Sequence, residues 1–479
     1  MQSPLTLHEL PSWRGIFCNR TLNLRSVKAI GYDMDYTLIH YKVEAWERAA
    51  FEHARRKLMD KGWPLDDARF DPLDYIRGLV VDLELGNIVK PNRFGYVKGA
   101  AHGLRMLHYT EQRRAYSRTP VDLEDKRFKF LNTLFALSEA AIYGFMVDLL
   151  DAGKAPEGAG VLGYGDLYDV VRRSVDETHV EGVLKAEILA NPEQYVELDE
   201  EVPLTLLDQK NAGKKILLIT NSGWPYTRGI MEYAFGQFLP DGMRWEEIFD
   251  IRIVGARKPL FFSHNNPVYE IVSDDGMLRP LALPSLESGK NYLGGHAGLV
   301  EESLGLDGEQ ILYVGDHAYG DVHASKSMRR WRTALVLREL EEELPALEAF
   351  AVQQEELTRL MAEKGKLERE LSRIRVALQR HRMGYGPKLD LTLSDMEGAI
   401  AERRQQVAEL DDQIAPLAEA SAGLANPRWG LLMRTGNDKS MMARHVERHA
   451  DVYTSRVSNL LHATPYHYLR SSRGSLPHD

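Results

Sequence analysis

The stretch that decides the fold reads VKAIGYDMDYTL and covers residues 27–38. Its first half, residues 27–32, is a short and mostly apolar run, which predicts a buried strand of a parallel sheet. Two carboxylates, Asp33 and Asp35, follow this strand directly. Ligands bind beyond the carboxyl ends of the strands in open α/β sheets, so both aspartates are candidate site residues. Pairs of this kind also occur in turns and calcium loops, and the rest of the chain has to decide between these interpretations.

Three further apolar runs repeat this arrangement, at residues 215–219, 250–254 and 311–314. Helical patterns lie between the later runs, at 225–233 and 298–304, and this alternation is typical of a parallel α/β sheet. Each run ends close to polar side chains. These are Thr220, Asn221, Ser222, Lys258, Asp316 and Asp321.

The chemistry of these strand ends is complementary. The segment 220–222 offers hydroxyl, amide and backbone N–H groups that suit phosphate oxygens. Lys258 adds a compact positive charge. Carboxylate and phosphate oxygens together are the ligands that Mg²⁺ prefers. Each feature alone has a structural explanation, as a helix cap, a surface lysine or a turn residue, but their coincidence at four strand ends predicts a Mg²⁺-dependent phosphate site.

Two long segments do not fit this alternation. Residues 43–200 are far longer than one crossover helix requires, which predicts an inserted, mostly helical domain. Residues 339–420 carry apolar residues at heptad spacing on both sides of a Gly/Pro breaker, which predicts an antiparallel helical hairpin. A capping box at Ser394–Glu397 is expected to open its second helix. The predicted domains are therefore a core at 1–42, an inserted cap or substrate domain at 43–200, the continued core at 201–338, the hairpin arm at 339–420 and a C-terminal segment packing on the core at 421–479.

Composition excludes several classes of protein. The 479 residues carry a formal net charge of −10, which gives no electrostatic footprint for coating nucleic acid. The single cysteine, Cys18, excludes an intramolecular disulfide framework and suits a reducing compartment. No apolar run reaches the ~18–20 residues needed to cross a bilayer, and the N-terminus lacks signal-peptide features. We therefore expect a cytoplasmic protein without nucleic-acid or membrane partners.

Longer motifs surround these positions. They are GYDMDYTL at 31–38, RGLV at 77–80, AHG at 101–103, LNTLF at 131–135, ARKPLFF at 256–262 and ILYVGDH at 311–317. These motifs resemble the haloacid dehalogenase superfamily of aspartate-nucleophile phosphohydrolases, and within it the cytosolic purine 5′-nucleotidase family. The similarity covers nearly the whole chain, with the hairpin as its loosest part. It implies an α/β fold, with a Rossmann-like parallel-sheet core, a large inserted mostly helical cap and a C-terminal helical hairpin.

The resemblance implies roles for the strand-end residues. Asp33 would be the nucleophile on phosphorus, and Asp35 would act as general acid and then as general base. The phosphoryl oxygens would be stabilised by Thr220, Asn221 and Lys258. The Mg²⁺ site would consist of the Asp33 carboxylate, the Asp35 backbone carbonyl and Asp316, with Asp321 completing the acidic cluster.

For the nucleoside end, Arg172, Asp176 and His179 share one face at helical spacing. This spacing by itself favours an exposed, salt-bridged helix, whereas the resemblance implies that these residues line the purine and ribose pocket. Phe135 would then stack on the base. The substrate-binding residues implied in this way are Asn132, Phe135, Arg172, Asp176, His179, Lys185 and Ser222.

The expected activity is hydrolysis of purine nucleoside 5′-monophosphates, with transfer of the phosphoryl group to an acceptor nucleoside as a possible second reaction. Two alternatives stay open at this stage. The same nucleophile could act on another small phosphoester, or the protein could be a non-catalytic scaffold that uses the helical arm. The arm and the family's habit also predict a homo-oligomer, either a dimer or a tetramer.

Overall fold

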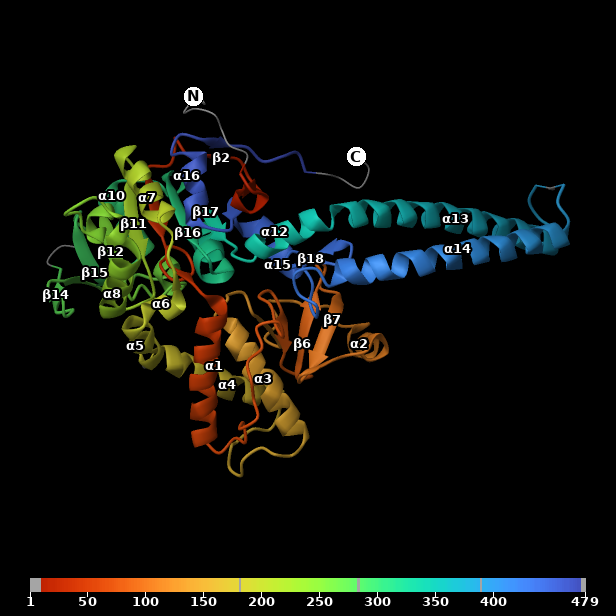
Figure 1. The fold of residues 1–479 in the computed structure, drawn as a ribbon, viewed down its shortest axis with the longest axis horizontal. Helices are drawn as coiled ribbons and strands as arrows, with labels where there is room; N and C mark the ends of the chain where they lie inside the picture. Colours follow the sequence, from red (N-terminus) through yellow and green to blue (C-terminus); the bar gives the residue numbers. More distant parts are fainter. Residues whose placement is uncertain (1–9, 181, 282–284, 388–389, 475–479) are drawn as a thin grey trace. The chain divides into compact units, whose positions relative to one another are not determined.

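The computed structural model describes residues 10–180, 182–281, 285–387 and 390–474 (Figure 1). The chain divides into two compact units. Unit 1 comprises Met1–Glu341 and Leu432–Asp479, and unit 2 comprises Glu342–Leu431.

A ten-stranded sheet forms the centre of unit 1, in the order β1-β20-β17-β16-β3-β11-β12-β15-β13-β14. Its neighbours from β20 to β15 pair in parallel, whereas β1, β13 and β14 add antiparallel edges. The four predicted strands are confirmed and lie side by side as β16, β3, β11 and β12. The strands are β1 (Ile16–Cys18), β3 (Ala29–Tyr32), β11 (Lys215–Ile219), β12 (Ile251–Val254), β13 (Val268–Ile271), β14 (Leu278–Pro280), β15 (Lys290–Gly294), β16 (Ile311–Gly315), β17 (Arg332–Val336) and β20 (Val452–Thr454).

The register of the central strands brings their carboxyl ends to one edge. Tyr32, the last residue of β3, pairs with Leu218 of β11 and with Val314 of β16. Ile219 of β11 in turn pairs with Ile253 of β12. The segments that follow these four strands therefore emerge next to one another, as expected for a parallel sheet.

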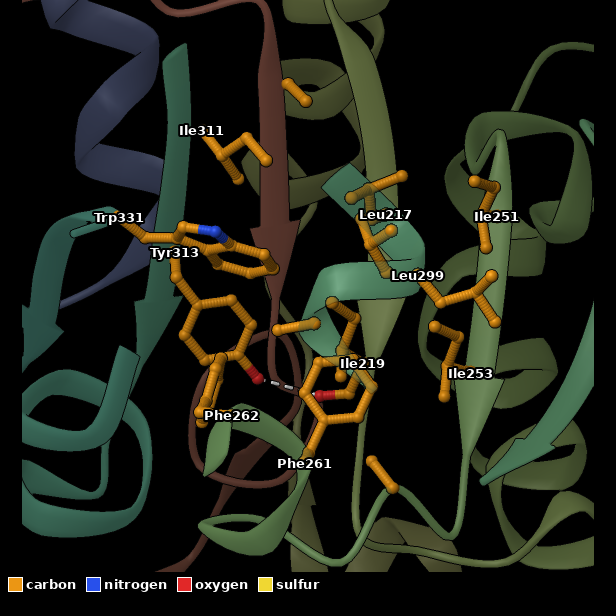
Figure 2. Packing of buried hydrophobic residues seen from close by; sticks show 14 of the residues in the cluster. Leu217, Ile219, Ile251, Ile253, Phe261, Phe262, Leu299, Ile311, Tyr313 and Trp331 are labelled. Atoms are coloured by element: carbon orange, nitrogen blue, oxygen red, sulfur yellow. Dashed lines mark hydrogen bonds between the residues drawn. The ribbon is translucent and has the colours of Figure 1, made fainter. Parts of the chain in front are cut away.

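Apolar side chains on these strands pack into a buried cluster with Phe262 and Trp331 (Figure 2). Tyr313 of β16 is part of this cluster, and its hydroxyl donates to the Ile219 carbonyl at 2.8 Å. Gly31 on the adjacent strand permits this packing, because a Cβ atom there would lie 2.9 Å from Tyr313 Cδ2. Helices of the core are α7 (Glu201–Asn211), α8 (Trp224–Phe235), α9 (Leu260–Ser263), α10 (Ala297–Leu304), α11 (Ala324–Arg329), α15 (Met441–His449) and α16 (Leu460–Ala463).

The segment between β3 and β11 is mostly helical, as predicted, and it also contains a sheet that the sequence did not indicate. Short paired strands stand where the chain enters and leaves it, β4 (His40–Tyr41) and β10 (Val196–Glu197). Its helices are α1 (Val43–Asp60), α2 (Tyr109–Tyr116), α3 (Ala136–Asp151), α4 (Tyr164–Val180), α5 (Val183–Ala190) and α6 (Pro192–Tyr195).

The additional sheet is antiparallel and has five strands, in the order β8-β7-β6-β5-β9. Its pattern was hard to detect because β6 is buried along its whole length although it contains Asn87 and Lys90. Asn87 is accommodated by a hydrogen bond from its Nδ2 to the Tyr116 hydroxyl at 2.9 Å. The strands are β5 (Val80–Asp82), β6 (Asn87–Pro91), β7 (Val97–His102), β8 (Arg105–Met106) and β9 (Phe128–Phe130).

Unit 2 is an antiparallel pair of long helices, α13 (Ala351–Met383) and α14 (Leu393–Ala422), so the predicted hairpin is confirmed. The predicted capping box is wrong in position. Thr392 caps α14, and its hydroxyl accepts from the Asp395 N–H at 3.2 Å. Thr392 and Asp395 have the same spacing as Ser394 and Glu397, and the helix begins at the earlier pair. Two apolar clusters hold the helices together, formed by Leu357, Leu360, Leu410 and Ile414 and by Leu371, Leu378, Met396 and Ile400.

Among the described residues, no helix combines the length and the apolar character needed to cross a bilayer.

Candidate active site

Asp33 stands at the centre of the edge where the four strands end. Its backbone N–H donates to the Val314 carbonyl at 2.9 Å, which ties the residue to the neighbouring strand β16. The side chain is 12% exposed, and its Oδ1 lies 2.8 Å from Lys258 Nζ. Burial raises the pKa of Asp33 to about 7, against the lowering effect of Lys258. The carboxylate of Asp33 is therefore paired with a positive charge that the protein itself supplies.

Lys258 follows β12 and uses all three protons of its ammonium group. Besides Asp33, Nζ contacts Asp321 Oδ1 at 2.7 Å and donates to the Tyr313 hydroxyl at 2.9 Å. Burial disfavours the charge, but the two carboxylates outweigh it and raise the pKa of Lys258 well above its usual range. The lysine therefore stays charged and links the ends of β3, β12 and β16.

Asp316, directly after β16, completes a cluster that can hold a metal ion. Carboxylate oxygens of Asp33, Asp316 and Asp321 lie within 4.8 Å of one another. Burial and the two neighbouring carboxyls raise the pKa of Asp316 well above its usual range. Its Oδ2 is buried and has no hydrogen-bond partner among the described residues. A buried oxygen of this kind requires a partner, and a divalent cation fits a site of crowded carboxylates.

A short π-helix, η5 (Ala318–His323), places Asp321 in this cluster. The His317 N–H donates to Asp321 Oδ2 at 3.1 Å, which leaves Oδ1 for Lys258. Gly315 is needed here for space, because a Cβ atom would lie 2.5 Å from Asp321 Oδ2. Asp321 thus acts as the anchor of Lys258.

Asp35 accepts hydrogen bonds on both carboxylate oxygens. The Tyr41 hydroxyl donates to Oδ1 at 2.6 Å, and the Ser222 hydroxyl donates to Oδ2 at 2.5 Å. Lys185, from α5 of the insert, donates to Ser222 Oγ at 2.8 Å. The predicted substrate ligands Ser222 and Lys185 therefore lie beside Asp35.

Thr220 and Asn221 follow β11, at the same edge of the sheet. Thr220 is fully buried, and its Oγ1 accepts from the Ser222 N–H at 3.1 Å. Both ends of the Asn221 amide bind the backbone of Lys258, with Lys258 N–H to Oδ1 at 2.6 Å and Nδ2 to the Lys258 carbonyl at 3.1 Å. The Asn221 side chain thus fixes the loop that carries Lys258.

Phe135 lies close to the nucleophile loop. Its ring centroid is 4.8 Å from that of Tyr36, the residue after Asp35, and 5.5 Å from that of Trp46. Asn132 donates from Nδ2 to the Phe130 carbonyl at 3.3 Å. Its Oδ1 is buried without a hydrogen-bond partner in the part of the chain that the structure describes.

Arg172, Asp176 and His179 of α4 are the three residues predicted to line the nucleoside pocket. Arg172 and Asp176 form an exposed pair, with Arg172 Nε 3.7 Å from Asp176 Oδ2 and side-chain exposures of 54% and 64%. This geometry matches the salt-bridged helix that spacing alone favours. His179 belongs to α4, but its side chain lies outside the described part of the structure.

Three residues that support the site were not singled out from the sequence for this purpose. Tyr313 contacts Lys258, and Tyr41 contacts Asp35. Arg77, from the insert, is buried, donates to the Asp316 carbonyl at 3.0 Å and pairs with Glu339 through Nε at 2.7 Å. In the sequence, the only signal for Arg77 was its position in an apolar motif. Tyr41 and Tyr313 could not be distinguished from ordinary core residues.

Comparisons with known proteins identify several similar chains. A 5′-nucleotidase domain-containing protein of Dictyostelium discoideum is 25% identical over 472 residues, which cover 97% of this chain and 74% of that protein. Similar solved structures include a predicted phosphoglycolate phosphatase from Haemophilus somnus (15% identity, 65% of this chain, 85% of that chain, TM-score 0.28). Another is CbbY from Rhodobacter sphaeroides in complex with phosphate (15% identity, 65% and 86% coverage, TM-score 0.26).

The sequence profile described as the 5′ nucleotidase family matches residues 16–479, nearly the entire chain. The expected relationship is thereby confirmed. The chain belongs to the 5′ nucleotidase family, and it is a phosphoric monoester hydrolase.

Proposed function

We propose that this protein is a Mg²⁺-dependent 5′-nucleotidase that hydrolyses purine nucleoside 5′-monophosphates through a phosphorylated Asp33. The observation that carries this proposal is the pairing of buried Asp33 with Lys258 beside the unpartnered Asp316 oxygen. A nucleophilic carboxylate, a fixed cation and a place for a metal are the three groups that phosphoryl transfer to an aspartate requires.

In the first half-reaction, an Asp33 oxygen attacks phosphorus and the bond from phosphorus to the 5′-oxygen breaks. We assign Oδ2 as the attacking atom, because Oδ1 contacts Lys258 and accepts from the Met34 N–H at 2.8 Å. Asp35 donates a proton to the departing 5′-oxygen, so that a neutral nucleoside leaves. The charge of Lys258 stabilises negative charge on the nucleophile and on the phosphoryl oxygens.

In the second half-reaction, Asp35 accepts a proton from water as the water oxygen attacks the aspartyl-phosphate. The bond between phosphorus and Asp33 breaks, inorganic phosphate forms and the carboxylate of Asp33 is restored. The same residue thus acts as acid in one step and as base in the other, and each catalytic group returns to its starting protonation state.

The metal would be held by the Asp33 carboxylate, the Asp35 backbone carbonyl and Asp316. When bound, Mg²⁺ supplies positive charge between the anionic nucleophile and the anionic phosphate. Arg77 supports this function by holding the Asp316 backbone, and Asp321 supports it by holding Lys258.

For the nucleoside, we propose stacking of the purine on Phe135, with Asn132 and the α4 residues Arg172, Asp176 and His179 around it. The aromatic group formed with Tyr36 and Trp46 supports this place, because it lies next to Asp35. A purine has a larger stacking face than a pyrimidine, so this contact favours purine substrates.

The test is phosphate release from IMP, GMP, AMP, CMP and two sugar phosphates, with Mg²⁺ and with EDTA. We expect the purine monophosphates to have the highest kcat/KM, and EDTA to remove the activity. Asp33→Asn should lower kcat by about 10³-fold or more, because an amide side chain is a far weaker nucleophile than a carboxylate. The exposed Asp67→Asn serves as the matched control and should retain full activity.

Two outcomes would contradict the proposal. Normal multiple turnover by Asp33→Asn would exclude Asp33 as the nucleophile. A kcat/KM for a sugar phosphate well above that for every nucleotide would establish the alternative substrate class. Added inosine or guanosine in the same assay tests transfer to an acceptor nucleoside, which would appear as a new nucleoside monophosphate.

A further inference from the structure

We propose that Tyr41 is a positioning residue, which together with Ser222 fixes the carboxyl group of Asp35, and that Tyr226 and Lys185 set the direction of their hydrogen bonds. This inference rests on the proposed function, in which Asp35 moves a proton to the leaving oxygen. It adds a layer of hydrogen bonds behind the acid.

The two contacts to Asp35 are short and use both of its oxygens. Tyr41 OH lies 2.6 Å from Oδ1, and Ser222 Oγ lies 2.5 Å from Oδ2. A carboxyl group held at both oxygens cannot rotate about its last bond without losing a hydrogen bond. Its plane is therefore set by the protein before substrate binds, which is the condition for efficient proton transfer.

On the Ser222 side, the donor of each hydrogen bond follows from chemistry. The Lys185 ammonium has only donors, so at 2.8 Å the Ser222 oxygen must accept from it. The single hydroxyl proton of Ser222 is then available for Asp35. Lys185 Nζ also lies 4.8 Å from the centroid of the Tyr226 ring, which keeps the ammonium in this position.

On the Tyr41 side, a second hydroxyl lies behind the first. Tyr226 OH is 2.9 Å from Tyr41 OH, and both rings are buried. When Tyr41 donates to Asp35, its oxygen can accept from Tyr226. When Asp35 carries a proton, Tyr41 and Ser222 can still donate to its oxygens, because a protonated carboxyl group keeps acceptor lone pairs. The proton of Asp35 then stays available for the 5′-oxygen, and the hydroxyl pair can serve Asp35 in both states that the two half-reactions require.

The four residues come from different parts of unit 1. Tyr41 lies in β4, where the chain enters the insert, and pairs with Val196 of β10, where the chain leaves it. Lys185 belongs to α5 of the insert, whereas Ser222 and Tyr226 belong to the core. The orientation of Asp35 therefore depends on contacts that the insert makes with the core.

The experiment compares kcat/KM for IMP with kcat/KM for p-nitrophenyl phosphate. A nucleoside is a poor leaving group and needs the proton from Asp35, whereas p-nitrophenolate leaves as a stable anion. This ratio of kcat/KM values reports only the steps up to leaving-group departure. We expect Tyr41→Phe to lower kcat/KM for IMP by about tenfold or more and to change that for p-nitrophenyl phosphate by less than about threefold. Asp35→Asn should show the same pattern with a larger effect.

Tyr32→Phe is the matched control, because it removes another buried hydroxyl, one that donates to Gln209 Oε1 at 2.6 Å and does not contact Asp35. It should affect both substrates equally. Thermal unfolding of each variant shows whether a loss of activity reflects a loss of folded protein. Equal losses for both substrates with Tyr41→Phe, or no loss for either, would overturn the assignment.

Failure of this inference can be separated from failure of the proposed function. If the wild-type protein hydrolyses p-nitrophenyl phosphate but no nucleotide, the proposed substrate is wrong. The comparison is then repeated with the alkyl phosphate that the wild type hydrolyses best. The role of Tyr41 is judged only from the ratio of variant to wild type.

Discussion

At the scale of single residues, Lys258 supplies the positive charge that the buried acidic site requires. Three carboxyl groups lie close together in a buried place, an arrangement that costs folding energy without compensating positive charge. Lys258 compensates two of them directly, and its contact with Tyr313 ties it to the apolar core. Within the described part of the chain, Asp316 Oδ2 has no hydrogen-bond partner.

Replacement of Lys258 by Met therefore has two opposite consequences. We expect kcat to fall by about 10²–10³-fold, because a charge that stabilises the transition state is lost. Mg²⁺ should bind at least as tightly as in the wild type, because a cation that repels it has been removed. The measurements are phosphate release and calorimetric titration with Mg²⁺. Loss of Mg²⁺ binding together with activity would show that Lys258 is needed to assemble the cluster itself.

Several single-residue roles could be read from the sequence and others could not. Asp33, Lys258 and Asp316 were identifiable because each follows an apolar strand, and the ends of neighbouring parallel strands must meet. The side-chain direction of Asn221 was not identifiable. It depends on the loop after β12, which is distant in sequence and folds back onto it.

At the scale of elements, η5 and α15 together carry a group of three histidines. His323, at the end of η5, lies next to His449 and His445 of α15, with ring centroids 4.3 and 6.0 Å away. Burial lowers the pKa of His445 to about 4 and that of His449 to about 3, with a further lowering from the neighbouring histidines. All three rings are therefore neutral at physiological pH.

This group predicts a loss of stability in mild acid. The two α15 histidines have pKa values in the folded state below their unfolded value of about 6.5, so the unfolded chain binds protons first. Their stabilising contribution is complete above pH 6.5 and falls as the pH drops towards 4. The slope should reach about 1.4 kcal/mol per pH unit for each histidine.

The measurement is the thermal unfolding midpoint at pH 7, 6 and 5. The double variant His445→Gln/His449→Gln should show a flatter dependence on pH than the wild type. His467→Gln, at an exposed histidine, should leave the dependence unchanged. An identical slope in the wild type and the double variant would show that other groups cause the acid sensitivity.

Elements differ in how clearly their residues indicate them. The central strands and the hairpin helices have continuous apolar runs or heptads, and the predicted positions are close to those observed. The five-stranded sheet of the insert was missed because its strands contain buried polar residues such as Asn87 and Lys90. Hydrophobic periodicity indicates a strand only when polar residues are kept out of the interior. In this sheet hydrogen bonds allow polar residues to be buried, and the periodicity is lost.

At the scale of the whole molecule, the chemistry and the hairpin belong to different units. The residues assigned to the site, from Asp33 to Glu339, all lie in unit 1. The apolar clusters of unit 2 are formed by its own two helices. The net charge of −10 is likewise a property of the whole chain and does not describe the site, where Lys258 and the proposed metal receive the anionic substrate.

Removal of the hairpin should therefore leave the reaction intact. The two helices can be shortened at Gln354 and Ser421, whose side chains lie 3.3 Å apart, with a short Gly/Ser linker between them. We expect kcat/KM to stay within about twofold of the wild type, because changes at sites that share no partners act independently. Light scattering on the same sample tests the predicted homo-oligomer and shows whether the arm contributes to it. Loss of turnover in a folded variant would mean that the site depends on unit 2.

The sequence by itself determined the parallel core, the order of its acidic and basic strand ends, the helical hairpin and the family. These features depend on local sequence patterns. Each strand run, each heptad repeat and each strand-end residue lies within a short stretch of consecutive residues. The tertiary structure decided which side chains meet. Lys258 with Tyr313, Asp35 with Tyr41, and Arg77 with Asp316 join segments far apart in the chain. Such contacts depend on how the whole sheet and the insert pack, and no local pattern encodes that packing.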